Sequence, residues 1–496
     1  MVPVMVAFLA MALAAAQAAP PNIVVVFSDD HARAAISAYG SKLIQTPGLD
    51  RIAKEGVRFD RHITGNPLCA PSRASLLTGK HSHANGHKDN TTSFDPNQQT
   101  FPKMLQKAGY ETAVVGKWHL VSNPTGFDFW EVLPGQGAYY NPEFITPAGR
   151  LRRQGYSTEI ITERALEWLR QPRSKPFFLL VGHKAPHRYW APGPNEYDLF
   201  KDQVFPEPPT LRTDYATLAS GAKKALMRVD KHLRIKNDLL VGFPPPGLDA
   251  DQTERWKAAF DGQDAEYRER LERTGDLLGT NYQRYLQNYL RCVAAVDKSV
   301  ATLMDELDRK GLTQNTVFVY ASDQGFFLGE NGWYDKRWFY EPSAGTPLLV
   351  RGPGVRSGVV SQVTSNVDLA PTILEWARVP APDDLHGKSL GPLLRGEKEE
   401  RPAAYGHFYE SDDPDHKVPK WVGVTTARHK IVYYYELGEW ELFDLQTDPL
   451  ERRNLWLSGP VGLKREMMRL LQSRQKDLGE ESWIRSRVDA AVRAAW

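Results

Sequence analysis

The stretch "NPLCAPSR", residues 66–73, places one of only two cysteines between two prolines and at the start of a predicted helix. Three interpretations are open for Cys69: a packed core thiol, a thiolate nucleophile, or a cysteine that is converted to another group. As a nucleophile, Cys69 would need its pKa lowered by Arg73 and by the helix N-terminus. The other chemically capable residues have to decide between the three.

Oxygen-bearing side chains follow two predicted buried strands. Asp29 and Asp30 end "NIVVVFSDD", and Asp323 and Gln324 lie near the end of "TVFVYASDQG". Oxygen ligands of this kind favour a hard divalent cation, Ca²⁺ or Mg²⁺, over zinc. A thiolate at Cys69 matches such an ion poorly.

Cationic and imidazole side chains gather in four further short stretches. A metal together with several fixed cations would bind a tetrahedral oxyanion and stabilise the charge on it during transfer. Taken singly, each residue also has an ordinary explanation, such as a solvated lysine or a satisfied loop histidine. The stretches "CAPSR", "GKWHL", "HKAPH" and "YDKRW" contribute Arg73, Lys117, His119, His183, His187 and Lys336.

The elements that must position these residues alternate between strands and helices. Continuous Val, Leu and Phe runs indicate strands buried on both faces, so we predict an α/β fold. Its core is a large, doubly wound, mainly parallel sheet with helices on both faces, and ligands bind beyond the carboxyl ends of such strands. All but the last predicted strand end in chemically capable residues. The runs are 22–30, 111–119, 176–183, 316–325 and 346–354.

The second cysteine has a simpler interpretation. Cys292 lies in a strong helical pattern, with Tyr285, Tyr289 and Val296 on the same face. We predict a buried core thiol there, which leaves Cys69 without a disulfide partner.

Changes in composition and in the predicted secondary structure divide the chain into three parts. Residues 1–18 resemble a signal peptide with an Ala16-Gln17-Ala18 cleavage site, the alternative being a retained apolar anchor. Cleavage would place the protein in the periplasm or outside the cell, with no membrane span remaining. We assign 19–400 to a catalytic domain, with 190–285 as an insertion at the rim of the site. Residues 401–496 are expected to form a small antiparallel sheet packed with a helix.

Composition limits the partners. The chain is 41% hydrophobic and 25% charged, with a formal net charge of +2. This near-balance argues against nucleic acid as a partner, because such proteins show a strongly basic face or tail.

Seven ordered segments resemble the landmarks of the formylglycine-dependent sulfatases, a family of the alkaline phosphatase superfamily. "CAPSRASLLTG" matches the pattern C-x-P-S-R followed by T-G, whose cysteine is oxidised to Cα-formylglycine. The others run from "VVVFSDD" through "GKWHL", "HKAPH", "SDQGFFLGE" with "DKR", and "TPLLVRGPG" to "ELFDLQTDPLERRNL". The chain is most similar to bacterial carbohydrate sulfatases related to N-acetylglucosamine-6-sulfatase.

The resemblance implies a mechanism. The aldehyde at residue 69 would hydrate to a diol, of which one hydroxyl attacks sulfur and the other expels sulfate by elimination. Ca²⁺, rather than Mg²⁺, would be held by Asp29, Asp30, Asp323, Gln324 and residue 69. A formylglycine-generating enzyme or an anaerobic sulfatase-maturing enzyme would modify Cys69.

The resemblance also implies a role for each remaining site residue. Arg73 and Lys117 would orient the diol, and His119 would assist proton removal. His187 and Lys336 would bind the sulfate of a sulfated saccharide and protonate the leaving oxygen. His183 is a further candidate for substrate contact.

Three positions depart from the family pattern. Gln324 stands where many members have Asn, Asn331 stands where His is expected, and "SAGTPLLV" lacks a basic residue before Thr346-Pro347. Two alternatives stay open: a phosphonate or phosphodiester hydrolase of the same superfamily, and a non-catalytic glycan-binding protein.

Overall fold

The computed structural model describes residues 19–410 and 413–495. The predicted signal peptide, residues 1–18, lies outside this range. Within the described ranges, no helix is both long and apolar enough to cross a membrane.

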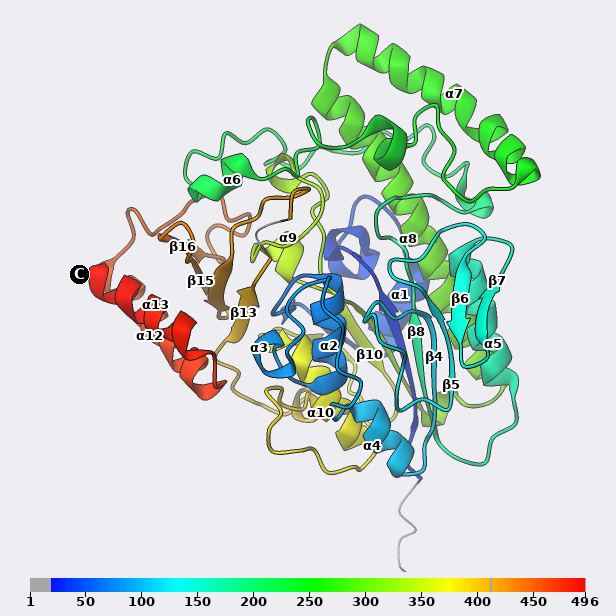
Figure 1. The fold of residues 1–496 in the computed structure, drawn as a ribbon, viewed down its shortest axis with the longest axis horizontal. Coiled ribbons are helices and arrows are strands. Elements are labelled where there is room, and N and C mark those ends of the chain that lie inside the picture. Colours follow the sequence, from blue (N-terminus) through cyan, green and yellow to red (C-terminus); the bar gives the residue numbers. More distant parts are fainter. Residues whose placement is uncertain (1–18, 411–412, 496) are drawn as a thin grey trace, which may run out of the picture.

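Five parallel strands form the centre of a ten-stranded sheet (Figure 1). Four of them were predicted, and their continuous apolar sequences bury both strand faces; the fifth, residues 129–133, was not predicted and is only partly buried. In spatial order they are β9 Thr316–Ser322, β1 Asn22–Ser28, β8 Phe177–Gly182, β4 Glu111–Lys117 and β5 Phe129–Leu133.

The edges of the sheet are mixed. The fifth predicted strand, β10 Leu348–Arg351, pairs with β9 in the antiparallel direction. The carboxyl end of β10 therefore lies at the opposite edge of the sheet from the carboxyl ends of the parallel strands, which carry the candidate site residues. Four further strands were not predicted at all, because each is only three or four residues long: β2 Val57–Phe59, β11 Gly358–Val360, β6 Glu143–Thr146 and β7 Gly149–Arg152.

Alternation along β1 directs side chains to two cores. Val24 and Val26 belong to one buried cluster, and Ile23, Val25 and Phe27 belong to the other. The first core lies under α1 Pro47–Glu55, α5 Ser157–Arg170 and α8 Leu277–Arg309, and the second under α2 Cys69–Thr78, α4 Phe101–Lys107 and α10 Leu369–Trp376. The helices on both faces confirm the predicted α/β class.

A small antiparallel sheet follows toward the C-terminus and lies beside the main body in Figure 1. Two helices accompany this sheet, where one was predicted. Its elements are β13 Ala404–Phe408, β14 Trp421–Thr425, β15 His429–Tyr434, β16 Glu439–Asp444, α12 Val461–Asp477 and α13 Ser482–Ala494.

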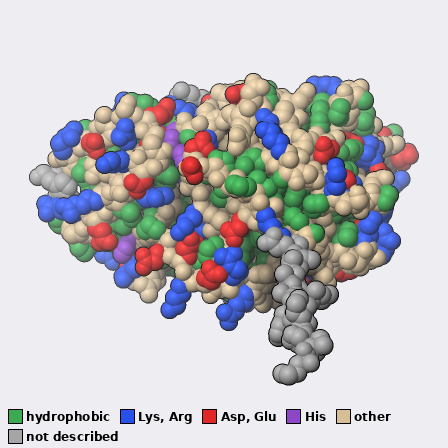
Figure 2. All heavy atoms as spheres, turned by 90° about the horizontal axis from the view of Figure 1, so that it is seen from below, with side chains coloured by type: hydrophobic (Ala, Val, Ile, Leu, Met, Phe, Trp, Pro, Cys, Tyr) green, Lys and Arg blue, Asp and Glu red, His purple; other side chains and the backbone are tan. Residues whose placement is uncertain are grey.

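The stretch before α8 contains the helix α7 Ala250–Thr274, which projects from the body in Figure 1. Asp249 caps its first turn by accepting a hydrogen bond from the backbone of Gln252. Figure 2 shows another face of the molecule, on which basic and acidic side chains are interspersed.

Candidate active site

Three carboxylates converge where the central strands end. Ser28 of β1 pairs with Ser322 of β9, so the residues that follow them lie side by side. The carboxylates of Asp29, Asp30 and Asp323 are all fully buried, and one oxygen of each lies within 4.8 Å of the others. Three buried carboxylates this close repel one another unless a cation separates them.

The donor set fits a hard divalent cation. Asp29 Oδ1 and Gln324 Oε1 are buried oxygens without a hydrogen-bond partner in the described structure. Burial raises the pKa of Asp30 to about 6, with Asp335 and Asp323 adding repulsion. A bound cation would satisfy these oxygens and remove the penalty. Two lysine ammonium groups form ion pairs with these carboxylates: Lys117 with Asp29, and Lys336 with Asp30.

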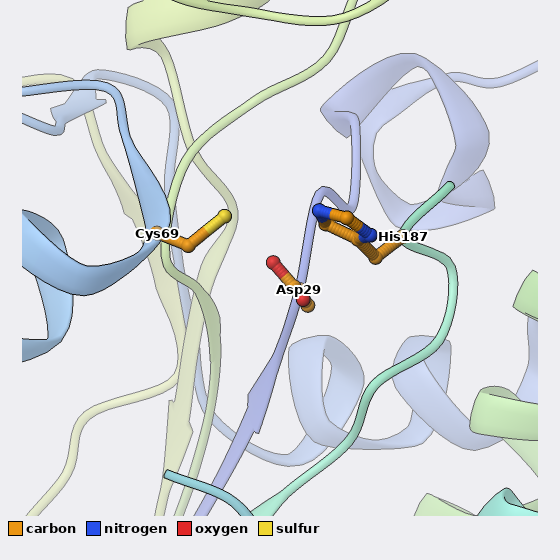
Figure 3. Close-up of side chains that lie close together, drawn as sticks. All are labelled: Asp29, Cys69 and His187. Carbon is orange, nitrogen blue, oxygen red and sulfur yellow. The ribbon is translucent and has the colours of Figure 1, made fainter. Parts of the chain in front are cut away.

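Cys69 is the first residue of α2, and its side chain reaches the same point. Its Sγ, an oxygen of Asp29 and a ring nitrogen of His187 lie within 4.8 Å of one another (Figure 3). Both cysteines are buried and free, as predicted. Burial raises the pKa of the Cys69 thiol to about 12, although Lys336 and Arg73 oppose it. This direction is opposite to the lowered pKa that the thiolate interpretation needs.

Arg73 lies one helical turn after Cys69 and ties α2 to two strand ends. Its Nε and Nη2 donate to Asp323 Oδ2 at 3.1 and 3.0 Å. Its Nη1 donates to the carbonyl oxygen of Lys117 at 2.9 Å. The side chain is nearly fully buried, so these contacts fix both the carboxylate and the residue-69 end of the helix.

Two imidazoles at the site are held neutral. Burial, followed by the Lys117 ammonium, lowers the pKa of both His119 and His187 well below the usual range. His187 Nε2 lies 3.7 Å from Asp30 Oδ2. His119 has a backbone φ of +58°, a left-handed conformation rare for a residue with a side chain. Strained backbone of this kind persists where surrounding contacts enforce it.

His183 takes a different direction. It is fully buried, and its Nε2 lies 2.9 Å from Ser299 Oγ on α8. Burial lowers its pKa to about 3. The structure therefore places this histidine between strand and helix, outside the cavity lining.

A cavity of about 340 Å³ opens beside the carboxylate cluster and is lined by Lys336 and His187. Its wall also contains Lys184 and Gln136, which sequence reasoning missed. Gln136 Oε1 accepts from Lys117 Nζ at 2.5 Å, and its carbonyl accepts from Lys184 Nζ at 3.1 Å. One loop residue thus positions two ammonium groups, and only Lys184's place in "HKAPH" hinted at it.

A second group of polar residues lines the same cavity. Arg337 pairs with Asp335, and His416 Nε2 lies 3.2 Å from Asp335 Oδ2. Asp335 and Arg337 have φ values of +76° and +85°. We call Asp335, Arg337 and His416 the paired wall, because their charges are balanced by contacts among themselves and with Glu410 and Asp413.

Comparisons with known proteins agree with the geometry. The family model "Sulfatase" matches residues 21–379, and the model "N-sulphoglucosamine sulphohydrolase, C-terminal" matches residues 329–477. The chain is 41% identical to an N-acetylglucosamine-6-O-sulfatase of Bacteroides thetaiotaomicron, over 92% of this chain and 86% of the relative. It is 26% identical to a choline-sulfatase of Rhizobium meliloti, over 95% and 89%.

A solved structure shows the same fold. Its TM-score is 0.89 at 40% identity, covering 93% of this chain and 99% of the other. That protein was solved in complex with its substrate D-glucosamine-2-N,6-O-disulfate.

Proposed function

The chain belongs to the sulfatase family and is a sulfuric ester hydrolase, and we propose that it removes the 6-O-sulfate from N-acetylglucosamine units of a sulfated saccharide. A single observation carries the proposal: one cavity is lined both by Lys336 and His187, the groups expected to bind sulfate, and by the paired wall. Carboxylate, guanidinium and imidazole groups fixed in this way are suited to sugar hydroxyls. The identity to an N-acetylglucosamine-6-O-sulfatase names the sugar to test first.

Residue 69 and the carboxylate cluster would supply the reacting group. We propose that Cys69 is oxidised to formylglycine and that Asp29, Asp30, Asp323 and Gln324 hold Ca²⁺ beside it. The aldehyde hydrate supplies the nucleophilic hydroxyl, and the cation supplies charge stabilisation for the sulfate oxygens. Arg73 holds Asp323 through two hydrogen bonds, and so fixes one carboxylate relative to residue 69.

The lysines and imidazoles position residue 69, bind the sulfate and transfer protons. Lys117 orients residue 69, and His119, held neutral, accepts a proton during elimination. Despite burial, the Asp30 carboxylate raises the pKa of Lys336, so Lys336 stays charged and is available to bind the sulfate and to protonate the leaving oxygen. An anionic substrate opposes the cations that depress the pKa of His187, and so lets this imidazole carry a proton to the leaving oxygen.

We also propose the cellular setting and the division of the chain. Modification by a formylglycine-generating or anaerobic sulfatase-maturing enzyme would accompany export to the periplasm or beyond. Residues 19–400 would form the catalytic unit with its 190–285 insertion, and 401–496 the smaller unit.

The test is hydrolysis of a panel containing N-acetylglucosamine-6-sulfate, its 3- and 4-sulfate isomers, and choline sulfate. We expect release of sulfate from the 6-isomer with the highest kcat/KM. Faster turnover of choline sulfate or of a phosphodiester than of any sugar would contradict the proposal. The C-terminal family match makes N-sulfated glucosamine a necessary member of the panel, with desulfated products identified by mass.

A further inference from the structure

The cavity carries an imbalance of charge that hydrolysis of one sulfate does not use. Three cations lie on its lining: Arg188 and Arg234, which share the carboxylate of Asp238, and Lys184, which contacts no carboxylate of the described residues. We call these three cations the basic wall. Arg188 contacts Asp238 through Nε and Nη2 at 2.7 and 2.8 Å, and Arg234 Nε reaches the same carboxylate at 3.3 Å.

Lys184 is the member of the basic wall that contacts no carboxylate at all in the part of the chain that the structure describes. It is 4% exposed, yet across residues 19–410 and 413–495 it forms no ion pair with a carboxylate. Its Nζ is 3.1 Å from the carbonyl of Gln136 and 3.5 Å from that of Arg188, and it lies 4.9 Å from the Tyr139 ring centre. Burial lowers its pKa to about 8, which is the cost of a charge without a partner.

Arg234 completes the wall at its outer side. Its side chain is 48% exposed, and its guanidinium lies 5.9 Å from the ring centre of Tyr189, a partly exposed cavity residue. Because Arg188 already occupies both oxygens of Asp238, the carboxylate leaves the wall with two uncompensated positive charges. An anion in the cavity would supply the missing counter-charge.

The paired wall has the opposite balance. Arg337 faces Asp335, Glu410 and Asp413, and His416 contacts two of these three carboxylates. This part of the lining therefore accommodates uncharged hydroxyl groups and disfavours a further anion. The two walls together would set which side of a charged sugar faces which part of the cavity.

We propose that the basic wall is a second anion subsite, which binds an anionic substituent of the substrate other than the sulfate that is removed. The inference rests on the proposed function. His187 and Lys336 are assigned to the reacting sulfate, and Lys117 and His119 to residue 69, so the basic wall is available for another group. The second anion is a sulfate on the same sugar or the carboxylate of a neighbouring uronic acid.

Three substrates test the proposal: N-acetylglucosamine-6-sulfate, glucosamine-2-N,6-O-disulfate, and a uronic acid linked to N-acetylglucosamine-6-sulfate. We expect kcat/KM for one of the two doubly anionic substrates to exceed that for the first by about tenfold. Lys184→Met and Arg234→Gln should each lower this ratio by about tenfold. The substrate that shows the effect identifies the source of the anion.

Arg273→Gln is the matched control, because Arg273 is an exposed arginine of the same insertion that does not line the cavity. It should leave the ratio unchanged. A ratio near one in the parent protein, or a ratio unaltered by both wall variants, would overturn the proposal. Added salt should reduce the part of the preference due to half-exposed Arg234.

A separate assay keeps this result apart from the proposed function. If none of the three substrates is hydrolysed at position 6, the proposed function fails. The basic wall is then tested through hydrolysis of 4-methylumbelliferyl sulfate. Stronger inhibition by N-sulfoglucosamine than by N-acetylglucosamine, lost in Lys184→Met, would still support the subsite, and equal inhibition would reject it.

Discussion

The Tyr289 hydroxyl, on α8, donates a 2.7 Å hydrogen bond to the carbonyl oxygen of Asp30, 259 residues away in the chain. The same hydroxyl accepts from the N–H of Ala32 at 2.8 Å. Asp30 has a φ of +64°, so its backbone is in the sparsely populated left-handed region. Tyr289 therefore closes a strained turn and aims the Asp30 carboxylate at the other two.

Removing this hydroxyl should loosen the metal site more than the fold. Tyr289→Phe is expected to weaken Ca²⁺ binding about tenfold and to lower the free energy of unfolding by about 1–2 kcal/mol. Calorimetric titration of metal-free protein with Ca²⁺ measures the first, and denaturant unfolding the second. Tyr285→Phe is the control, because Tyr285 donates a similar 2.7 Å bond from the same helix to the carbonyl of Phe327. Equal Ca²⁺ affinities of the two variants would show that Tyr289 does not position Asp30.

Residue 69 should be necessary for turnover but not for folding. Protein from a host with maturation machinery should give a residue-69 peptide lighter than its cysteine form by the thiol-to-aldehyde mass difference. Cys69→Ala should abolish sulfate release, whereas Cys292→Ala should retain activity and lose about 1–2 kcal/mol of stability, because Cys292 is a fully buried core residue. Full activity of protein that contains only unmodified cysteine at this position would refute the assigned nucleophile.

Metal removal should abolish activity reversibly. After exhaustive chelation, Ca²⁺ should restore turnover better than Zn²⁺, because the proposed ligands are all oxygen atoms. Asp323→Asn should weaken Ca²⁺ binding and also loosen Arg73, which loses its charged acceptor. Metal content and activity measured on the same samples check both effects, and undiminished activity in metal-free protein would count against the site.

The metal-free protein should show an unusual pH dependence at Asp30. Burial raises its folded-state pKa from 3.8 to about 6, so the folded protein binds more protons than the unfolded chain between these values. This group's contribution to stability therefore falls as the pH rises through that window. Thermal unfolding of the parent and of Asp30→Asn, with chelator present, should give a difference that changes in this direction. Saturating Ca²⁺ should reverse it, since the cation binds the ionised carboxylate.

Lys336 should matter most for poor leaving groups. Lys336→Ala should reduce kcat for a sugar sulfate by roughly 10²–10⁴-fold, and for an activated aryl sulfate by much less, since a good leaving group needs little protonation. Steady-state kinetics on both substrates measures the difference. An equal loss on both would assign Lys336 to sulfate binding alone.

Much of the site was predictable because parallel strands bring their carboxyl ends to one edge. Asp29 and Asp323 follow, and Lys117 ends, a strand whose continuous apolar sequence marks it as buried, so a parallel arrangement of these strands is enough to predict that they converge. The seven ordered segments then predicted the family, which the comparisons confirm. Cys69 could likewise be singled out from the sequence, because the neighbouring prolines and the predicted helix start lie within a few residues of it.

The same logic failed where contacts between distant segments decide orientation. His183 ends a strand like the others, yet its ring contacts Ser299 on α8 and not the cavity. The final predicted strand, β10, runs antiparallel to β9, a direction that its apolar run does not encode.

What the sequence determined by itself is therefore the set of chemically capable groups: the buried carboxylates, the residue-69 motif and the strands that carry them. Only the tertiary structure decided the surroundings of those groups. The basic wall joins residues 184–188 to Arg234, and the paired wall joins residues 335–337, in the segment between β9 and β10, to His416, in the segment between β13 and β14. The physical reason is that a local pattern fixes which face of a strand is buried, whereas the balance of charge in a cavity depends on which carboxylate each distant cation meets.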